Sequence, residues 1–335
     1  MKKSRNITTV VFIIAMFLFT LFLISCGGGG GSTGDGGTPT ISYTGIKDEA
    51  SIGDDNATDL TTESYTNGSL GSAMSDIAAS QTENSEHVYT PRMLKVSNVL
   101  KDSLFKVDLT SRSTGTFAGA VSQVTDTIAG SCGGSASYTI SVNDETGAFS
   151  SSFTYNNYCE GGVIISGSVD FSGQFDVATE TFLTFEFSFN NLSTTLGGDS
   201  VTVKGNMSFN MTGSPIILTM TILIKDSSIN RVYWVKDYRL AITEGVGYAD
   251  IDISGRFYHP EHGYVTLSTE QVLRLYDLDD YPSSGILLIT GKTGAEGGKT
   301  KARITFHSSS TYQVEADTNG DGLYDDYGVS NWADL

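Results

Sequence analysis

The stretch Ile165-Ser-Gly-Ser-Val-Asp-Phe-Ser-Gly-Gln-Phe175 alternates between apolar or small residues and polar residues along its whole length. In an extended chain, Ile165, Val169 and Phe171 fall on one face, and the serines and Asp170 fall on the other. A period of two residues is typical of a β-strand with one buried face and one face in water. The stretch therefore predicts a strand in a sheet that is solvated on one side.

The same alternation continues through most of the chain. It returns in Phe185, Phe187 and Phe189, and turn residues such as those of Gly197-Gly-Asp199 separate most of the expected strands. No periodic stretch of helical length interrupts residues 116–316, so successive strands should pair with one another. The sequence predicts an all-β fold with about a dozen strands in one large antiparallel meander. We expect residues 90–335 to form this single domain.

So wide a sheet cannot leave its apolar face in water, and it must fold into a sandwich, close into a barrel or curl around something else. Gly167, Gly173, Gly205 and Gly255 fall on the apolar face, where glycine permits a bend or the close approach of another element. We therefore expect a barrel or half-open barrel, with an interior that is solid or holds an apolar ligand. A transmembrane barrel is the competing geometry, but the C-terminal residue, Leu335, is not the aromatic residue common in such barrels.

The N-terminus has three parts in order: a basic segment from Met1 to Arg5, an apolar run from Val10 to Ile24, and Ser25-Cys26-Gly27. The apolar run is short for a membrane span, which needs about 20 residues, and it ends in small residues as a cleaved signal does. This segment resembles the signal peptide and lipobox of bacterial lipoproteins. The resemblance implies that residues 1–25 are removed, that Cys26 is acylated and becomes the mature N-terminus, and that Gly27 permits export to the outer membrane. An uncleaved anchor helix is the alternative.

Residues 26–89 are first rich in glycine and then polar and acidic, which predicts the lipidated cysteine followed by a flexible linker. A helix is expected over about residues 91–106. Pro91 suits its first position, and apolar residues recur at helical spacing from Met93 to Leu104. Because this apolar stripe needs an apolar surface, we expect the helix to pack on the sheet.

Two cysteines follow Cys26, and both stand beside glycines, in Cys132-Gly-Gly and Cys159-Glu-Gly-Gly. In an exported chain, such a pair predicts one disulfide that clasps the hairpin between the two cysteines. This hairpin would turn at residues 143–147. A redox-active or metal-binding pair is the alternative, but the Cys-x-x-Cys spacing that favours it is missing.

The sharpest local motif is Asp317-Thr-Asn-Gly-Asp-Gly-Leu-Tyr-Asp-Asp326. It resembles the calcium loops of EF-hands, dockerins and thrombospondin type 3 repeats. The resemblance implies a calcium ion held by side-chain oxygens of Asp317, Asn319, Asp321 and Asp325 and by the carbonyl of Leu323. Position twelve is Gly328 instead of a bidentate glutamate, and no flanking helices are evident. A metal-free hairpin turn explains the same residues, and both interpretations stay open.

The acidity of the chain excludes one class of partner. Its formal net charge is −18, from 38 acidic and 20 basic residues, and Lys and Arg do not cluster after Arg5. Nucleic acid binding needs a basic surface, so we expect no nucleic acid partner. His259 and His262 are spaced as two metal ligands, but they lie between two expected strands and are more simply part of a polar turn.

The sequence identifies no serine, cysteine or carboxylate pair with a catalytic base, so we expect a protein that is not an enzyme. We expect a lipoprotein that is attached to the outer membrane by its lipid and is either periplasmic or surface-exposed. Its expected role is to carry an apolar ligand or lipid. A surface adhesion or structural role is the first alternative, followed by a transmembrane β-barrel and then by a cell-surface hydrolase. The sequence does not determine the oligomeric state.

Overall fold

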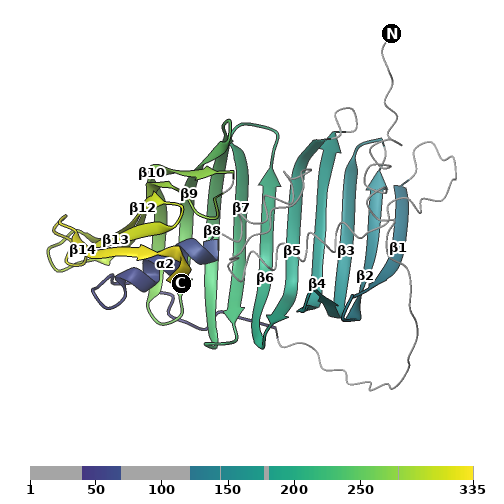
Figure 1. Ribbon diagram of the computed structural model, residues 1–335, viewed down its shortest axis with the longest axis horizontal. Coiled ribbons are helices and arrows are strands. Elements are labelled where there is room, and N and C mark those ends of the chain that lie inside the picture. Colours follow the sequence, from purple (N-terminus) through teal and green to yellow (C-terminus); the bar gives the residue numbers. More distant parts are fainter. Residues whose placement is uncertain (1–39, 69–120, 144, 177–180, 278, 335) are drawn as a thin grey trace, which may run out of the picture.

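The computed structural model describes residues 40–68, 121–143, 145–176, 181–277 and 279–334. Within these ranges one helix, α2 (Ala57–Gly68), precedes a 14-stranded antiparallel sheet in which every strand pairs with its neighbours in sequence. Figure 1 shows β1 to β8 standing side by side, whereas β13 and β14 turn crosswise beside α2. The predicted all-β meander is confirmed. Among the described strands, β1 and β14 are the two edges and do not pair with each other, so this sheet is open.

The first seven strands of the sheet are β1 (Val121–Ala129), β2 (Gly133–Asn143), β3 (Ala148–Glu160), β4 (Val163–Asp176), β5 (Thr181–Leu196), β6 (Asp199–Asn210) and β7 (Ile216–Asp226). The other seven are β8 (Arg231–Glu244), β9 (Tyr248–His259), β10 (Gly263–Tyr276), β11 (Ser284–Thr293), β12 (Lys299–Ser308), β13 (Thr311–Asp317) and β14 (Asp325–Asn331). A short 3-10 helix, η1 (Trp332–Asp334), follows the last strand.

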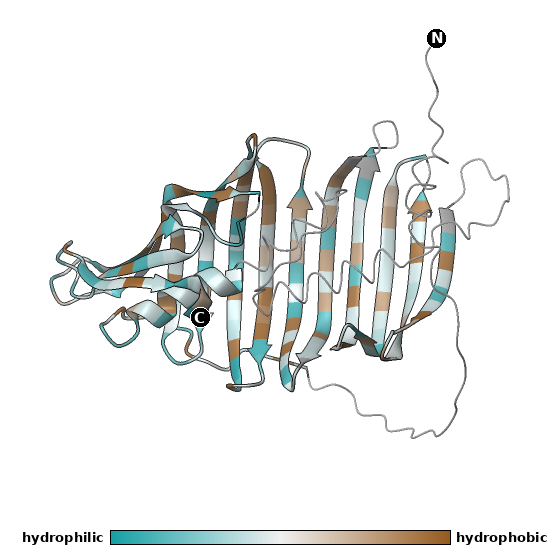
Figure 2. Ribbon diagram, viewed as in Figure 1, coloured by the Kyte–Doolittle hydropathy of each residue, from teal (hydrophilic) through white to brown (hydrophobic). Residues whose placement is uncertain are grey.

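The alternation seen in the sequence decides which face of each strand is buried. In β3, Phe153 and Tyr155 are buried while Ser152 and Thr154 are exposed. Figure 2 shows the same change between hydrophobic and hydrophilic residues along most strands. The buried residues form one continuous core along a single face of the sheet, from Ala136 in β2 to Trp332 after β14. This face is called the apolar face below, and the opposite one the polar face.

Bulges opposite glycines bend the sheet. Asn191 in β5 has a φ of 51°, and a Cβ on Gly167 in the adjacent β4 would lie 2.4 Å from the carbonyl oxygen of Asn191. The same arrangement recurs where Asp237 in β8, with a φ of 51°, faces Gly255 in β9, whose added Cβ would lie 2.6 Å from the Cα of Tyr238. A bulge pushes its backbone toward the next strand, and only glycine leaves room for it. The predicted close approach at glycine is thus confirmed, although the sheet does not close.

The chain before α2 lies against the sheet. Glu49 forms a parallel bridge with Tyr264 of β10, and Ala50 and Ile52 are fully buried, at 0% exposure. The helix itself packs against β8, β12 and β13. The prediction that residues 26–89 form a linker is therefore wrong for residues 40–68, which belong to the folded domain.

The sequence did not reveal α2, because the residues on its buried face have helical spacing but are mostly small or polar. These residues are Ala57, Leu60, Thr61, Ser64, Tyr65 and Gly68, together with Thr62 beside them. The hydroxyl of Thr61 donates to the carbonyl of Ala57 one turn earlier, and that of Ser64 donates to the carbonyl of Thr61 at 2.9 Å. Such bonds satisfy buried hydroxyls within the helix, so a polar sequence can occupy an apolar site.

Two predicted features lie outside the described residues. These are the signal peptide with Cys26 and the helix expected over residues 91–106. In the ranges that the structure does describe, no helix is both long enough and apolar enough to cross a membrane.

Candidate functional site

The predicted disulfide is present and joins the hairpin ends. Cys132 precedes β2 and Cys159 lies near the end of β3, with their Cα atoms 5.0 Å apart. The N–H of Cys132 also donates to the carbonyl of Cys159 at 3.2 Å. At the other end, the Asn143 side chain accepts hydrogen bonds from two backbone N–H groups of the turn. The bridge therefore ties together two strands that already pair, which is a structural role.

The acidic loop connects β13 to β14. Asp317 is the last residue of β13 and is only 2% exposed. Its carboxylate accepts hydrogen bonds from the N–H groups of Gly320 at 2.7 Å, Asp321 at 3.2 Å and Gly322 at 2.9 Å. These bonds fold the loop into the turn of a hairpin, as the metal-free interpretation requires.

The other predicted calcium ligands bind one another or the backbone. Asp321 accepts hydrogen bonds from the N–H of Leu323 at 2.7 Å and from the amide of Asn319 at 3.0 Å, and these bonds lower the pKa of Asp321. Asp325 begins β14 and is paired with Ala316. Among the described residues, no group of three or more His, Cys, Asp and Glu side chains is arranged to hold a metal ion. Oδ1 of Asp317 accepts two of the loop's hydrogen bonds, but Oδ2 accepts only one and keeps a further acceptor position, so calcium binding at this loop stays a prediction.

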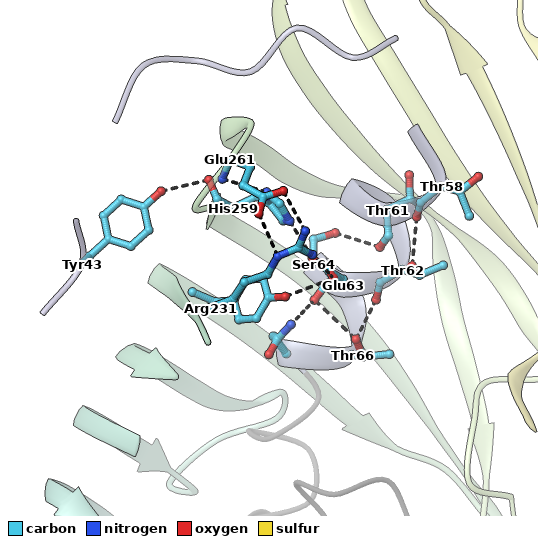
Figure 3. Close-up of polar contacts among 12 residues, drawn as sticks. Tyr43, Thr58, Thr61, Thr62, Glu63, Ser64, Thr66, Arg231, His259 and Glu261 are labelled. Atoms are coloured by element: carbon cyan, nitrogen blue, oxygen red, sulfur yellow. Dashed lines mark hydrogen bonds and ion pairs between the residues drawn. The ribbon is translucent and has the colours of Figure 1, made fainter. Parts of the chain in front are cut away.

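A partly buried polar cluster joins α2 to the sheet. His259, the last residue of β9, is 1% exposed, and its Nε2 lies 3.1 Å from Oε2 of Glu63 in α2, although the two atoms are not aligned for a hydrogen bond (Figure 3). The ring Nδ1 accepts a hydrogen bond from the N–H of Glu261 at 3.1 Å. Nδ1 therefore carries no proton, and the ring proton lies on Nε2, which faces Glu63.

Two further side chains complete the cluster. The Tyr233 hydroxyl donates to Oε1 of Glu63 at 3.1 Å, and burial, followed by the charge of Glu63, raises the pKa of Tyr233. Arg231 lies 3.8 Å from the same Oε1 and forms a bidentate pair with Glu261, at 3.1 and 2.7 Å. In this way one glutamate of α2 is connected to β8, to the end of β9 and to the turn after it.

The turn that the sequence analysis treated as polar is thus partly buried. The ring of His262 stacks on that of His259 with centroids 4.4 Å apart, and burial, followed by the neighbouring imidazole, lowers the pKa of His262. Tyr43 donates to the carbonyl of His259 at 3.0 Å (Figure 3), and burial raises the pKa of Tyr43 to about 12. Because a substrate cannot reach a side chain that is 1% exposed, we assign His259 the role of fastening α2 and the preceding chain to the sheet.

An open groove lies on the polar face. Its volume is about 1020 Å³, and its lining comes from seven adjacent strands, β2 to β8. Asp170 and Ser172, from the stretch that predicted the first strand, line it together with the exposed Ser150, Ser152 and Glu186. The groove is therefore the hollow side of the solvated face that the sequence predicts.

Neither the polar cluster nor the groove was predicted from the sequence. Glu63 sits in a segment taken for linker, so nothing in the sequence connected it to His259. The sequence does contain a pattern that corresponds to the groove, namely serine, threonine and acidic residues at alternate positions of successive strands. That pattern becomes a site only once the strand register brings these residues side by side.

Comparison of the chain with protein-family models, with curated proteins and with solved structures finds no match in any of the three, so the comparisons place it in no enzyme family.

Proposed function

We propose that this protein is a lipid-anchored adhesion protein of the outer membrane, which binds its partner at the cell surface through the polar face of the sheet. The observation that carries the proposal is the open groove of about 1020 Å³ on that face. The role involves no catalysis. It is the surface-adhesion alternative of the sequence analysis, now given a location on the molecule.

The two faces of the sheet differ in how many side chains they expose to a binding partner. Side chains such as Phe153 and Phe187 on the apolar face are buried, at 0% and 3% exposure. On the polar face, Ser152, Glu186 and Asn206 are exposed at the groove. Binding at the polar face therefore requires no rearrangement of the core.

The lipid on Cys26 would supply the attachment. Acylation at this position would tether the domain to the membrane by its N-terminal end. The net charge of −18 keeps such a domain soluble and away from polyanions.

The experiment is a comparison of whole cells that express the wild-type chain or the Cys26→Ser variant. A clickable palmitate analogue should label the wild-type protein and not the variant, and externally added protease should remove the protein from intact cells. Cells with the wild-type protein should also attach to surfaces better than cells that lack it. Failure of labelling would contradict the anchor, and protection from protease would contradict the surface location.

A second candidate function is carriage of an apolar ligand or lipid, with the curled sheet acting as a half-open barrel. The observation that favours it is a run of aromatic rings on the apolar face of β3 to β5. Phe153 and Phe171 have centroids 5.5 Å apart, Phe171 and Phe185 5.7 Å, and Phe185 and Phe187 4.7 Å. The main contacts of α2 lie on other strands, β8, β12 and β13. Native mass spectrometry of the purified protein would detect a retained lipid as extra mass, and its absence would remove this candidate.

A further inference from the structure

The groove on the polar face is built from two rows of side chains that cross the strands. Adjacent strands lie about 4.8 Å apart, so the seven strands that line the groove extend it over about 29 Å. It is therefore long, shallow and open, and its long axis runs perpendicular to the strands. Such a shape suits an extended chain better than a compact small molecule, which needs a deeper pocket.

The first row follows directly from the strand register. Each member is paired with the next one across the sheet, from β3 to β7: Ser150, Ser172, Glu186, Ser208 and Thr219. All are polar, and all but one are small. A chain lying along this row meets a new hydroxyl or carboxylate at every strand.

The second row runs parallel to the first, two residues away along each strand. The register again pairs each member with the next: Ser152, Asp170, Ser188, Asn206 and Thr221. Together the two rows offer paired polar groups on both sides of the same axis, repeated at the strand spacing.

Several of these groups have no partner within the described part of the protein. There, Ser150, Ser152, Ser172, Ser188 and Glu186 form no side-chain hydrogen bond, whereas Ser208 and Thr219 bond each other at 2.7 Å. Each free serine hydroxyl can both donate and accept, and the carboxylate can accept. The middle of the groove therefore presents unused donors and acceptors to whatever lies in it.

Charge narrows the class of ligand. The lining contains three carboxylates, of Asp170, Glu186 and Asp237, and Arg239 of β8 is the only basic residue among the side chains that line it. An anionic polymer needs a run of basic side chains, so the groove does not suit one. Protein interfaces centre on buried aromatic or aliphatic side chains, and the two rows contain none.

We propose that the groove binds a linear glycan without acidic groups, which lies across the strands. Every sugar of such a chain presents hydroxyls to both sides, and in an extended chain each sugar advances by about the distance between two adjacent strands. Serine side chains are short enough to let the sugar rings approach the backbone, while Asp170 and Glu186 accept hydrogen bonds from sugar hydroxyls. This inference rests on the proposed function, because it names the partner of the same face.

The test uses the full-length protein as purified from cells in detergent micelles, titrated with chitohexaose and cellohexaose in a calorimeter. The variant Ser152→Lys/Asn206→Lys places two long cationic side chains in the second row at exposed positions. The matched control, Ser268→Lys, adds a lysine at an exposed position of β10, outside the groove. Circular dichroism and thermal unfolding should be the same for all three proteins, so that a change in affinity reports on the groove.

We expect at least one hexasaccharide to bind the wild-type protein, the double variant to bind about tenfold more weakly or worse, and the control to match the wild type. The inference would be overturned if both sugars failed to bind, if an alginate oligosaccharide bound more strongly, or if the wild type and the double variant had equal affinity.

The two proposals fail in different ways. If the cells attach through the groove but neither sugar binds, the glycan is wrong and the adhesion role stands. If the sugars bind but Cys26 is not acylated or the protein is not at the surface, the adhesion role is wrong and the glycan site stands.

Discussion

Truncation of Leu60 to alanine tests whether α2 belongs to the folded core. Leu60 is 0% exposed, on a helix that packs against β8, β12 and β13. The substitution removes the three carbon groups beyond Cβ, and at about 0.8 kcal/mol per group this costs roughly 2.4 kcal/mol of transfer free energy. The cavity left behind adds to this cost, so we expect the free energy of unfolding to fall by about 3–4 kcal/mol. The melting temperature should drop by about 6–16 °C.

The assay is urea unfolding with the disulfide intact, followed by tryptophan fluorescence. Trp332 is a suitable reporter because its ring lies 5.3 Å from that of Tyr65 in α2. Thr58→Ala is the matched control, since Thr58 lies exposed on the same helix and its loss should change stability by less than about 0.5 kcal/mol. If Leu60→Ala is as mild as Thr58→Ala, then α2 does not support the core, and residues 40–68 act as the linker that the sequence suggested.

Three further predictions concern the other sites. Replacing both Cys132 and Cys159 by serine opens a loop with a sequence separation of 27 residues, and loop entropy predicts a loss of about 3.5 kcal/mol in urea unfolding. Glu63→Ala leaves the buried Nε2 of His259 facing no carboxylate and should cost about 1–3 kcal/mol, whereas Glu63→Gln keeps an acceptor and should cost less. If the acidic loop binds calcium, calcium should raise the melting temperature of the wild-type protein, and Asp321→Ala should abolish that rise.

Each of these three predictions would be contradicted by a specific result. A double serine variant that loses less than about 1 kcal/mol would show that the hairpin does not need its bridge. Equal losses for the two Glu63 variants would show that the acceptor is unimportant and that packing of the side chain decides. A melting temperature that calcium leaves unchanged would leave the acidic loop as a hairpin turn alone.

The strands were predictable because their signal is local. Phe153 and Tyr155 alternate with serine and threonine, and each residue of such a strand reveals its own face without reference to any other strand. The disulfide was predictable for a related reason, since Cys132 and Cys159 bracket one hairpin and its two strands bring them together. Short sequence distance made both inferences reliable.

The helix α2 and its polar cluster were not predictable, because their signals depend on distant partners. Thr61 and Ser64 look like linker residues until the structure shows their hydroxyls bonded within the helix. Glu63 acquires a role only when β9 brings His259 to within 3.1 Å of it. No local pattern of residues encodes such a contact.

By itself the sequence determined the strands, the buried and solvated face of each strand, the meander order and the hairpin disulfide. These follow from periodicity and from pairing between neighbours, which are short-range effects. Only the tertiary structure decided that the sheet stays open, that residues 40–68 join the core and that polar side chains of seven strands align in one groove. The physical reason is register. A shift of one residue between two strands would leave every strand intact, yet it would turn the side chains of one strand to the other face and break the rows that cross the sheet.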